Sequence, residues 1–388
     1  MVHASLLGAI PGWTLVALSA AGSLYTLAAA WVLARFGPRG APARRSEPVT
    51  LLKPLYGAEP RLFENLATFC ALGHGGPVQI VIGVQRADDP AHDVVARLRE
   101  MFPDRRIDVA TDGALDSANG KIANLVAMAP HAVHQVLVLS DSDIAVPPDY
   151  LAHLLAALDS PGVGAVTCAY RGRGDAGFWS RLGAAGLDWQ MLPGVVFGVA
   201  TGLATPCMGS TIALRAETLA AIGGFESLTD TLADDYAIGA AVRARGERVA
   251  LAPQLVTHGS AEASLSELWR HEVRWSATVR GVEPLGHALS MVAMPLPLAL
   301  LAVPFAPGAG LFALLAAWLA RALLVLAAGR ATGTKALKSH AIGLALLPAR
   351  DILSFAVYSA SFVARSVDWR GAHLRMTTGG RIEAGAET

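Results

Sequence analysis

Two carboxylates with one residue between them, Asp141 and Asp143, directly follow the apolar run Val136–Leu139. On an extended segment, side chains two residues apart point to the same side. Such a pair can hold a hard divalent cation together with a diphosphate, because Mg²⁺ and Mn²⁺ take a few carboxylates plus phosphate oxygens and water. A solvated turn would carry the same residue types, so the argument depends on the position directly after a buried strand.

Two further acidic groups have positions suited to chemistry. Asp89 is the second acid after the apolar run Val78–Val84, and Asp234 stands next to Asp235 after a Gly-rich stretch. Paired acids at a loop-to-helix junction can be a plain N-cap, which is the simpler account of Asp234. One of two close carboxylates can also have a raised pKa and act as general base on a sugar or alcohol hydroxyl.

The segment Trp269–Trp275 combines aromatic and basic side chains just before a long apolar block. An Arg such as Arg274 can clamp a phosphate, while a neighbouring indole such as Trp275 packs against a sugar face or a lipid boundary. An interfacial aromatic with a snorkelling Arg is the simpler account, and it applies to Trp269.

Short apolar runs alternate with helix-length stretches between residues 48 and 283. Runs rich in branched residues, typical of buried strands, lie at 49–52, 78–84 and 136–139, and helix-length stretches lie at 61–72, 91–101 and 117–129. This alternation predicts an α/β domain with a doubly wound sheet. In such a sheet, ligands bind beyond the carboxyl ends of the strands, where the acidic residues are expected.

The composition indicates a membrane protein with a sizeable water-facing part. Only 16% of the residues are charged, whereas an ordinary soluble domain carries about 25%. The apolar run Trp13–Ala34 can cross about 30 Å of hydrocarbon as a helix, so residues 1–36 are predicted to form an uncleaved anchor. Basic residues place the next segment in the cytoplasm by the positive-inside rule: Arg35, Arg39, Arg44 and Arg45.

Residues 284–364 form a second apolar block, predicted to contain transmembrane or re-entrant segments. A break at 304–310 divides its first part into helices of about 285–303 and 310–329. The basic loop at 330–338 that follows is expected in the cytoplasm.

The last apolar stretch, 340–364, is interrupted around Pro348. It predicts either a kinked span or two half-helices that re-enter on one side. A basic cytoplasmic tail at 365–388 favours the re-entrant form, through Arg365, Arg370, Arg375 and Arg381. The apolar, aromatic stretch at 179–202 is interpreted either as a core helix or as a helix lying in the membrane interface.

Charge and cysteine usage exclude other classes. Lys+Arg and Asp+Glu balance at 31 each, so no basic excess recruits nucleic acid. Three widely spaced cysteines, Cys70, Cys168 and Cys207, give neither a disulfide framework nor a CxxC metal site.

Taken in order, the motifs resemble those of the inverting GT-A glycosyltransferases of family 2, and within them the ceramide glucosyltransferase branch, family 21. The matching segments are Leu51–Gly57, Gln85–Pro90, Asn119–Asn124, Asp141–Asp143, Ala233–Tyr236 and His271–Trp275. The resemblance implies a Rossmann-like nucleotide-diphospho-sugar transferase (GT-A) domain at 48–283, flanked by transmembrane helices.

Two departures narrow the resemblance. His271 stands where Gln or Arg is usual, and Ala233-Asp234 replaces the more familiar Glu-Asp. Both are most similar to a bacterial subgroup associated with hopanoid biosynthesis. That subgroup implies transfer from a UDP-N-acetyl-hexosamine, with UDP-N-acetylglucosamine expected, to a hopanoid polyol. Ceramide glucosylation from UDP-glucose is the alternative.

For the donor, the resemblance implies that Asp89 contacts the uridine and that Lys53, Lys121 and His271 contribute to the nucleotide site. It further implies that Asp141 and Asp143 hold Mg²⁺ or Mn²⁺ on the diphosphate. The metal would offset charge on the departing UDP.

For the acceptor, the resemblance implies that Asp235 takes the proton from the lipid hydroxyl as it attacks the anomeric carbon, with inversion. Arg274 and Trp275 are expected to close over the pyrophosphate and acceptor. The expected location is the inner membrane, with the catalytic domain facing the cytoplasm.

Three rivals remain open. A processive polysaccharide synthase shares these motifs but usually has Gln at the position of His271 and more membrane spans. A non-catalytic membrane scaffold would not need three intact acidic motifs. A transporter would need more charges within the apolar segments and a smaller water-facing part.

Overall fold

The computed structural model describes all residues except 1, 39, 41, 44, 112–118, 230, 334–336, 365, 370–371, 377–381 and 385–388. It leaves the side chains of 2–9, 337–340 and 366–384 undescribed as well. Most of the basic residues expected to mark cytoplasmic segments therefore lie outside the described residues or side chains: Arg39, Arg44, Lys335, Lys338, Arg365, Arg370, Arg375 and Arg381.

The chain divides into two units, which we name the sheet unit and the helical unit. The sheet unit consists of Gly37–Ala184, Ala204–Ala263 and Ser366–Thr388, and the helical unit of Met1–Phe36, Ala185–Leu203 and Ser264–Arg365. Residues 185–203 and 264–283, which the sequence places in the catalytic domain, belong to the helical unit in this division.

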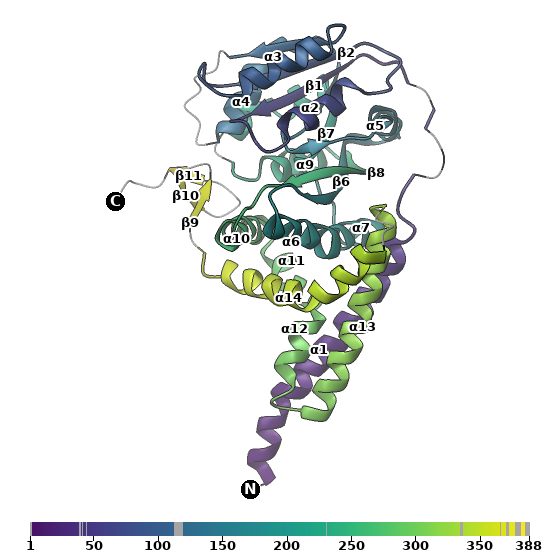
Figure 1. Cartoon of the computed structure of the whole chain (residues 1–388), viewed down its shortest axis with the longest axis vertical. Helices are drawn as coiled ribbons and strands as arrows, with labels where there is room; N and C mark the ends of the chain where they lie inside the picture. Colours follow the sequence, from purple (N-terminus) through teal and green to yellow (C-terminus); the bar gives the residue numbers. More distant parts are fainter. Residues whose placement is uncertain are drawn as a thin grey trace. The chain divides into compact units, whose positions relative to one another are not determined.

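The sheet unit is built on a mixed sheet with the order β3-β2-β1-β4-β7-β6-β8-β5 (Figure 1). Its strands are β1 Val49–Leu55, β2 Val78–Val84, β3 Arg106–Ala110, β4 Val136–Leu139, β5 Ile144–Ala145, β6 Val163–Gly174, β7 Ile212–Arg215 and β8 Arg248–Ser260. The run β3-β2-β1-β4 is parallel, as predicted, but β7 is antiparallel to both β4 and β6. The predicted α/β class is confirmed, and the sheet is mixed rather than purely doubly wound, in keeping with the GT-A fold.

The central strands of this sheet are buried throughout because helices cover both of its faces. Every residue of β1, β2 and β4 is buried, as expected for strands dominated by branched apolar residues. The covering helices are α2 Leu62–Cys70, α3 Ala91–Met101, α4 Gly120–Met128, α5 Tyr150–Leu158, α8 Ala216–Ala221 and α9 Asp234–Ala244. The three helices predicted between the strands are present as α2, α3 and α4.

The C-terminal tail has its own backbone arrangement within the sheet unit. Strands β9 Ser366–Trp369, β10 Ala372–Met376 and β11 Ile382–Ala384 pair antiparallel in the order β11-β10-β9. The sequence predicted only a basic tail here.

The helical unit contains long apolar helices. Its helices are α1 Val2–Leu33, α7 Leu192–Thr201, α10 Leu265–Val282, α11 Pro284–Leu289, α12 Pro295–Ala302, α13 Pro307–Ala331 and α14 Leu337–Ser361. Among the described residues, Ile10–Leu33, Pro307–Ala331 and Ala341–Ser361 are long and apolar enough to cross a membrane. The chain is therefore a membrane protein by helix length and composition.

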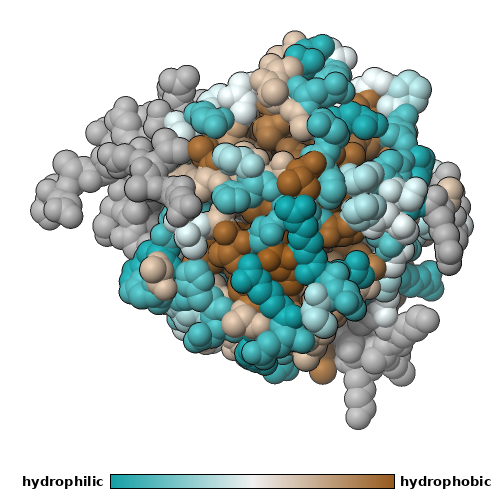
Figure 2. Space-filling model, turned by 90° about the horizontal axis from the view of Figure 1, so that it is seen from above, coloured by the Kyte–Doolittle hydropathy of each residue, from teal (hydrophilic) through white to brown (hydrophobic). Residues whose placement is uncertain are grey.

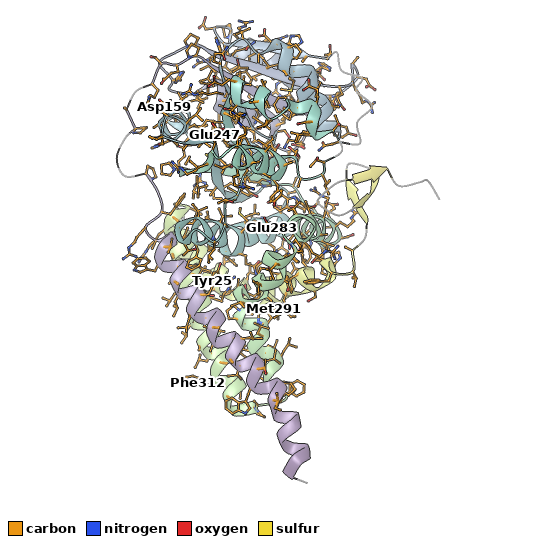
Figure 3. All side chains as sticks on the ribbon, turned by 180° about the vertical axis from the view of Figure 1, so that it is seen from behind. Tyr25, Asp159, Glu247, Glu283, Met291 and Phe312 are labelled. Carbon is orange, nitrogen blue, oxygen red and sulfur yellow. The ribbon has the colours of Figure 1, made fainter. Side chains whose placement is uncertain are left out.

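Large apolar side chains on these helices are exposed, as a lipid-facing surface requires. Trp13 is 59% exposed on α1 and Phe312 is 75% exposed on α13 (Figure 3). The face seen in Figure 2 instead carries many hydrophilic side chains.

The helix expected at 285–303 is broken. Residues Pro284–Ala293 and Pro295–Ala302 form two pieces bent by 68°. Pro295 begins the second piece, and the residue before a proline is driven out of the helical region; Met294 has φ −119° and ψ 58°.

The helix at the end of the block is continuous. α14 runs through Pro348 to Ser361 rather than forming two half-helices. Figure 1 shows it lying across the direction of α1 and α13.

Residues 178–202 form one helical stretch with a π-helical segment inside it. α6 Phe178–Gly186 leads into the π-segment Leu187–Met191, which leads into α7. Phe197 of α7 contacts the ring of Tyr25 on α1, with centroids 5.0 Å apart. The last part of the stretch thus packs against the N-terminal apolar helix.

Candidate active site

The acidic pair Asp141 and Asp143 sits where β4 ends and the chain turns back into β5. Strand β5 pairs with β8, and Ile144 lies opposite His258 in this register. The pairing brings the imidazole Nε2 of His258 to 3.2 Å from Oδ2 of Asp143. The other carboxylate oxygen of Asp143, Oδ1, is buried and has no hydrogen-bond partner among the described residues.

This donor set fits a divalent cation. A buried carboxylate oxygen without a partner is costly unless a ligand binds it, and imidazole and carboxylate are both common metal ligands. The described residues contain no group of three or more His, Cys, Asp or Glu that could hold a metal ion. Diphosphate oxygens and water would therefore supply the remaining ligands, as is usual for Mg²⁺.

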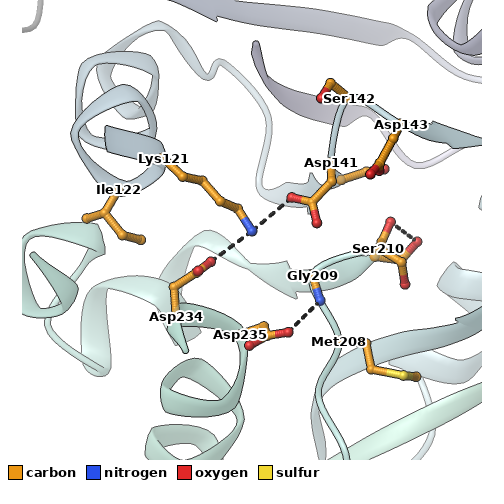
Figure 4. A network of polar contacts seen from close by, with 12 residues as sticks. Lys121, Ile122, Asp141, Ser142, Asp143, Met208, Gly209, Ser210, Asp234 and Asp235 are labelled. Atoms are coloured by element: carbon orange, nitrogen blue, oxygen red, sulfur yellow. Dashed lines mark hydrogen bonds and ion pairs between the residues drawn. The ribbon is translucent and has the colours of Figure 1, made fainter. Parts of the chain in front are cut away.

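Lys121 joins two of the acidic motifs (Figure 4). Its ammonium Nζ lies 2.8 Å from Oδ1 of Asp141 and 2.9 Å from Oδ2 of Asp234. The side chain of Asn119 caps α4 by accepting a hydrogen bond from the backbone N–H of Lys121. This cap fixes the backbone position from which the lysine side chain extends. Burial alone would lower the pKa of Lys121, but the surrounding carboxylates, Asp141 foremost, raise it above its ordinary value.

Asp235 is held by the backbone through both of its carboxylate oxygens. The N–H of Gly209 donates to Oδ2 at 2.9 Å, and the N–H of Tyr236 donates to Oδ1 at 2.7 Å (Figure 4). Burial raises the pKa of Asp235 to about 6, and the charge of Asp234 adds to the effect. A carboxylate with this pKa can accept a proton near neutral pH, as a general base must.

Gly209 occupies a place where no side chain fits. A Cβ at this position would lie 2.8 Å from Oδ2 of Asp141 and 3.0 Å from Nζ of Lys121. The same residue donates the hydrogen bond to Asp235. The backbone of Gly209 therefore lies between the Lys121–Asp141 pair and Asp235.

Lys53 lies beneath the acidic loop rather than open to solvent. It is fully buried on β1, and its ammonium donates to the backbone oxygen of Asp141 and, at 3.2 Å, to Oγ of Ser140. The ammonium also lies 3.9 Å from the ring centroid of Phe69. Burial lowers the pKa of Lys53 to about 7, against the opposing effect of nearby carboxylates. These contacts hold the loop that carries Asp141.

Asp89 connects two loops at the ends of β1 and β2. Its carboxylate accepts the N–H of Gly57 at 3.0 and 3.1 Å and the N–H of Ala91 at 2.8 Å. Gly57 has φ +70°, a conformation that favours glycine.

The remaining predicted site residues, His271, Arg274 and Trp275, lie on α10 in the helical unit. The rings of His271 and Trp275 contact each other edge to face, with centroids 4.5 Å apart. The structure thus brings Lys121, Asp141, Asp143, Asp234 and Asp235 together in the sheet unit.

Comparison with known proteins identifies the family. The model of glycosyl transferase family 21 matches residues 13–382. The chain belongs to glycosyl transferase family 21. This finding confirms the family resemblance seen in the motifs, while the hopanoid-associated subgroup stays a prediction.

Curated relatives of this family 21 protein include two from Caenorhabditis elegans. Ceramide glucosyltransferase 3 is 24% identical over 241 residues, covering 58% of this chain and 49% of that protein. Ceramide glucosyltransferase 1 is 23% identical over 232 residues, covering 58% and 48%. The chain spans about half the length of the curated relatives it matches.

Solved structures with some similarity to this chain include one from Pyrobaculum calidifontis and one from Mycobacterium tuberculosis. A mannosyltransferase from Pyrobaculum calidifontis, in complex with GDP-mannose and Mn²⁺, is 22% identical, covers 91% of this chain and 98% of its own, and has a TM-score of 0.49. Glucosyl-3-phosphoglycerate synthase from Mycobacterium tuberculosis, with Mn²⁺ and UDP-glucose, is 14% identical, with coverage of 60% and 78% and a TM-score of 0.37.

Two residues of this cluster escaped the sequence-based prediction. His258 lies beside Asp143 through the pairing of β5 with β8, and the sequence around this histidine gives no signal of that contact. Gly209 has no side chain, and its fit depends on the neighbouring side chains of Asp141 and Lys121, which the sequence alone does not place beside it.

Proposed function

We propose that this family 21 protein is a membrane-anchored inverting glycosyltransferase that moves one sugar from a UDP-sugar to a hydroxyl of a membrane lipid. The observation that carries the proposal is the cluster in which Lys121 connects Asp141 to Asp234, with Asp235 beside them. Such a cluster combines carboxylates for a metal diphosphate with a carboxylate of raised pKa. These are the two functions that transfer to an alcohol needs.

On the donor side, Asp143, His258 and Asp141 would hold Mg²⁺ or Mn²⁺. A cation bound there offsets the charge that develops on the departing UDP. Asp89 is proposed to contact the uridine at the ends of β1 and β2. Lys53 keeps the acidic loop in place from below, which is a positioning function.

On the acceptor side, Asp235 is proposed to take the proton from the lipid hydroxyl as the oxygen attacks the anomeric carbon. Attack from the face opposite to UDP inverts the configuration at that carbon. Lys121 offsets the negative charge of Asp141 and Asp234, which keeps Asp235 able to ionise near neutral pH. For Arg274 and Trp275 we propose the contacts to pyrophosphate and acceptor that the family motif implies.

We infer a hopanoid polyol as acceptor and UDP-N-acetylglucosamine as donor. The departures at His271 and Ala233 support this inference. Ceramide with UDP-glucose is the second candidate, and the names of the two curated relatives favour it.

We place the protein in the inner membrane, with the acidic cluster on the cytoplasmic side. Arg35 and Arg45 follow the apolar helix α1, and a positive flank of this kind stays in the cytoplasm. The proposed donor fits this side as well, because the charged diphosphate of a nucleotide sugar does not cross the bilayer and the sugar nucleotide stays in the cytoplasm.

The experiment is a matrix of donors and acceptors. Detergent-solubilised protein is incubated with a hopanoid polyol or ceramide and with UDP-N-acetylglucosamine or UDP-glucose, with and without EDTA. Mass spectrometry of the extracted lipid identifies the product. A hexosamine on the hopanoid that disappears with EDTA supports the whole proposal. Glucosylated ceramide would keep the proposed reaction type but would change the acceptor to ceramide and the donor to UDP-glucose. If none of the pairs gives a glycosylated lipid, the proposal is contradicted for these lipids.

A further inference from the structure

Two consecutive residues of α14, Arg350 and Asp351, are buried and pair with different helices. The guanidinium of Arg350 donates to both carboxylate oxygens of Glu272 on α10, at 2.7 and 2.8 Å. The carboxylate of Asp351 accepts from Nε and Nη2 of Arg321 on α13, at 2.8 and 2.6 Å. α14 is therefore tied to a helix on either side by a two-pronged ion pair.

The charged residues of α14 whose side chains are described, Arg350 and Asp351, lie on its buried face. Arg350 and Asp351 are 3% and 1% exposed, while the apolar Ile342 and Ile352 are 61% and 47% exposed. A surface helix in water shows the opposite pattern. Ionisable groups placed inside an apolar segment are costly and are retained where they have a partner and a function.

The π-segment Leu187–Met191 is held by the same network. Arg321 also donates from Nη1 to the backbone oxygen of Trp189 at 2.8 Å, and Ser354 of α14 donates to the side chain of Gln190. π-helical turns are rare and occur often at functional sites.

A glycine leaves space for the guanidinium of Arg350. A Cβ at Gly186 would lie 2.6 Å from the central carbon of that guanidinium. Any other residue at this position would displace Arg350 from Glu272. The local sequence is thus fitted to the ion pair.

Glu272 lies next to the family motif on α10. Arg274 and Trp275 come three and four residues after His271, so the three side chains lie on one side of the helix. Glu272 is one residue on, so its side chain leaves the helix about 100° from that of His271. Holding Glu272 therefore fixes the direction in which the motif face points.

A second contact, two turns further along α10, keeps this helix from pivoting about the Arg350–Glu272 ion pair. Arg280 donates to the backbone oxygens of Ser361, at the end of α14, and of Ala364, the latter at 2.8 Å. With both ties in place, α10 can neither turn nor slide along α14.

We propose that the Arg350–Glu272 ion pair, braced by Arg321–Asp351, is a positioning clamp that sets the orientation of His271, Arg274 and Trp275 for transfer. The proposal rests on the proposed function. Glu272 and Arg350 are positioning residues, because neither is required to touch the substrate.

The test compares Glu272→Gln, Arg350→Ala and the reversed pair Glu272→Arg/Arg350→Glu. Each variant is measured for kcat, for KM of the UDP-sugar, for UDP affinity and for hydrogen exchange of the α10 amides. The matched control is Arg106→Ala, which removes an exposed arginine from its ion pair with Asp108 in the sheet unit.

The clamp predicts that each single variant lowers kcat on the order of 10²-fold, because a small misplacement of reacting groups has effects of that size. UDP affinity falls by a much smaller factor than kcat, because most of the proposed donor contacts lie outside α10. The α10 amides exchange faster, and Arg106→Ala behaves as wild type. The reversed pair regains part of kcat and of the amide protection.

Wild-type kcat in Glu272→Gln would overturn the clamp. The clamp would also be overturned if the reversed pair folds and protects the α10 amides from exchange as wild type does, but has the low kcat of the single variants. If Arg350→Ala does not fold, Glu272→Gln and the reversed pair still decide. If wild-type protein transfers no sugar, the proposed function fails, whereas faster α10 exchange in Glu272→Gln still supports the clamp and unchanged exchange overturns it.

Discussion

The ammonium of Lys121 lies 2.8 Å from a carboxylate oxygen of Asp141, which is the second residue after the end of β4. The same ammonium reaches Asp234 at the start of α9. One lysine thus connects the strand end expected to face the diphosphate with the helix end that carries Asp235. The charge of Lys121 accordingly affects both the donor and the acceptor half of the proposed reaction.

Replacing Lys121 by Met should raise the pKa of Asp235 above about 6, because Lys121 opposes the upward shift. The ionised form of the base would then be populated only at higher pH. We expect the acid limb of the kcat profile to move to higher pH, while Lys121→Arg, which keeps the charge, stays closer to wild type. An unmoved limb in Lys121→Met would show that the lysine does not tune this carboxylate.

In the wild-type protein, kcat should rise with pH through about 6 and then level off. Asp235 must be ionised to accept a proton, and burial holds its pKa at about 6. The check is kcat at saturating donor and acceptor across this range, with UDP affinity measured in parallel to show that the fold persists. A kcat that is highest below the midpoint would assign the titration to a group that must be protonated.

Gly209→Ala should lower transfer strongly while the protein stays folded. The added methyl group would press on Asp141 and Lys121, and misplacing a catalytic cluster by about 1 Å can lower rates on the order of 10²-fold. Gly308→Ala on α13 is the matched control, because nothing lies within 4 Å of a Cβ there. Equal activity in the two variants would mean that the cluster tolerates the methyl group.

His258→Ala should weaken the binding of Mn²⁺ in the presence of UDP, because it removes the imidazole beside Asp143. Changes next to a metal ligand typically lower affinity about 10- to 100-fold. Titration of Mn²⁺ followed by magnetic resonance gives the affinity directly, and His134→Ala serves as a histidine control. If His258→Ala binds Mn²⁺ as tightly as wild type, the cation is held elsewhere.

Much of the fold could be predicted because local patterns determine it. β1, β2 and β4 are rich in branched apolar residues, and the structure buries each of them completely. The bend at Met294 was missed because the run around it is uniformly apolar. Only Pro295, with its effect on the preceding residue, marks the break.

The position of the candidate site was predictable where motif residues lie at a strand end, as for Asp141, or at a helix start, as for Asp235. It was not predictable where contacts depend on register between distant strands, as for His258, or on space rather than chemistry, as for Gly209. Lys53 shows a further limit, since a lysine in an apolar run can serve the loop above it rather than a ligand.

The central claim is that Asp235 is the general base, and turnover by Asp235→Asn tests it most directly. The asparagine keeps the shape of the side chain but cannot take up the proton. We expect Asp235→Asn to bind UDP as wild type does and to form no glycosylated lipid detectable by mass spectrometry. Transfer at a rate near that of wild type, with UDP binding intact, would contradict the account.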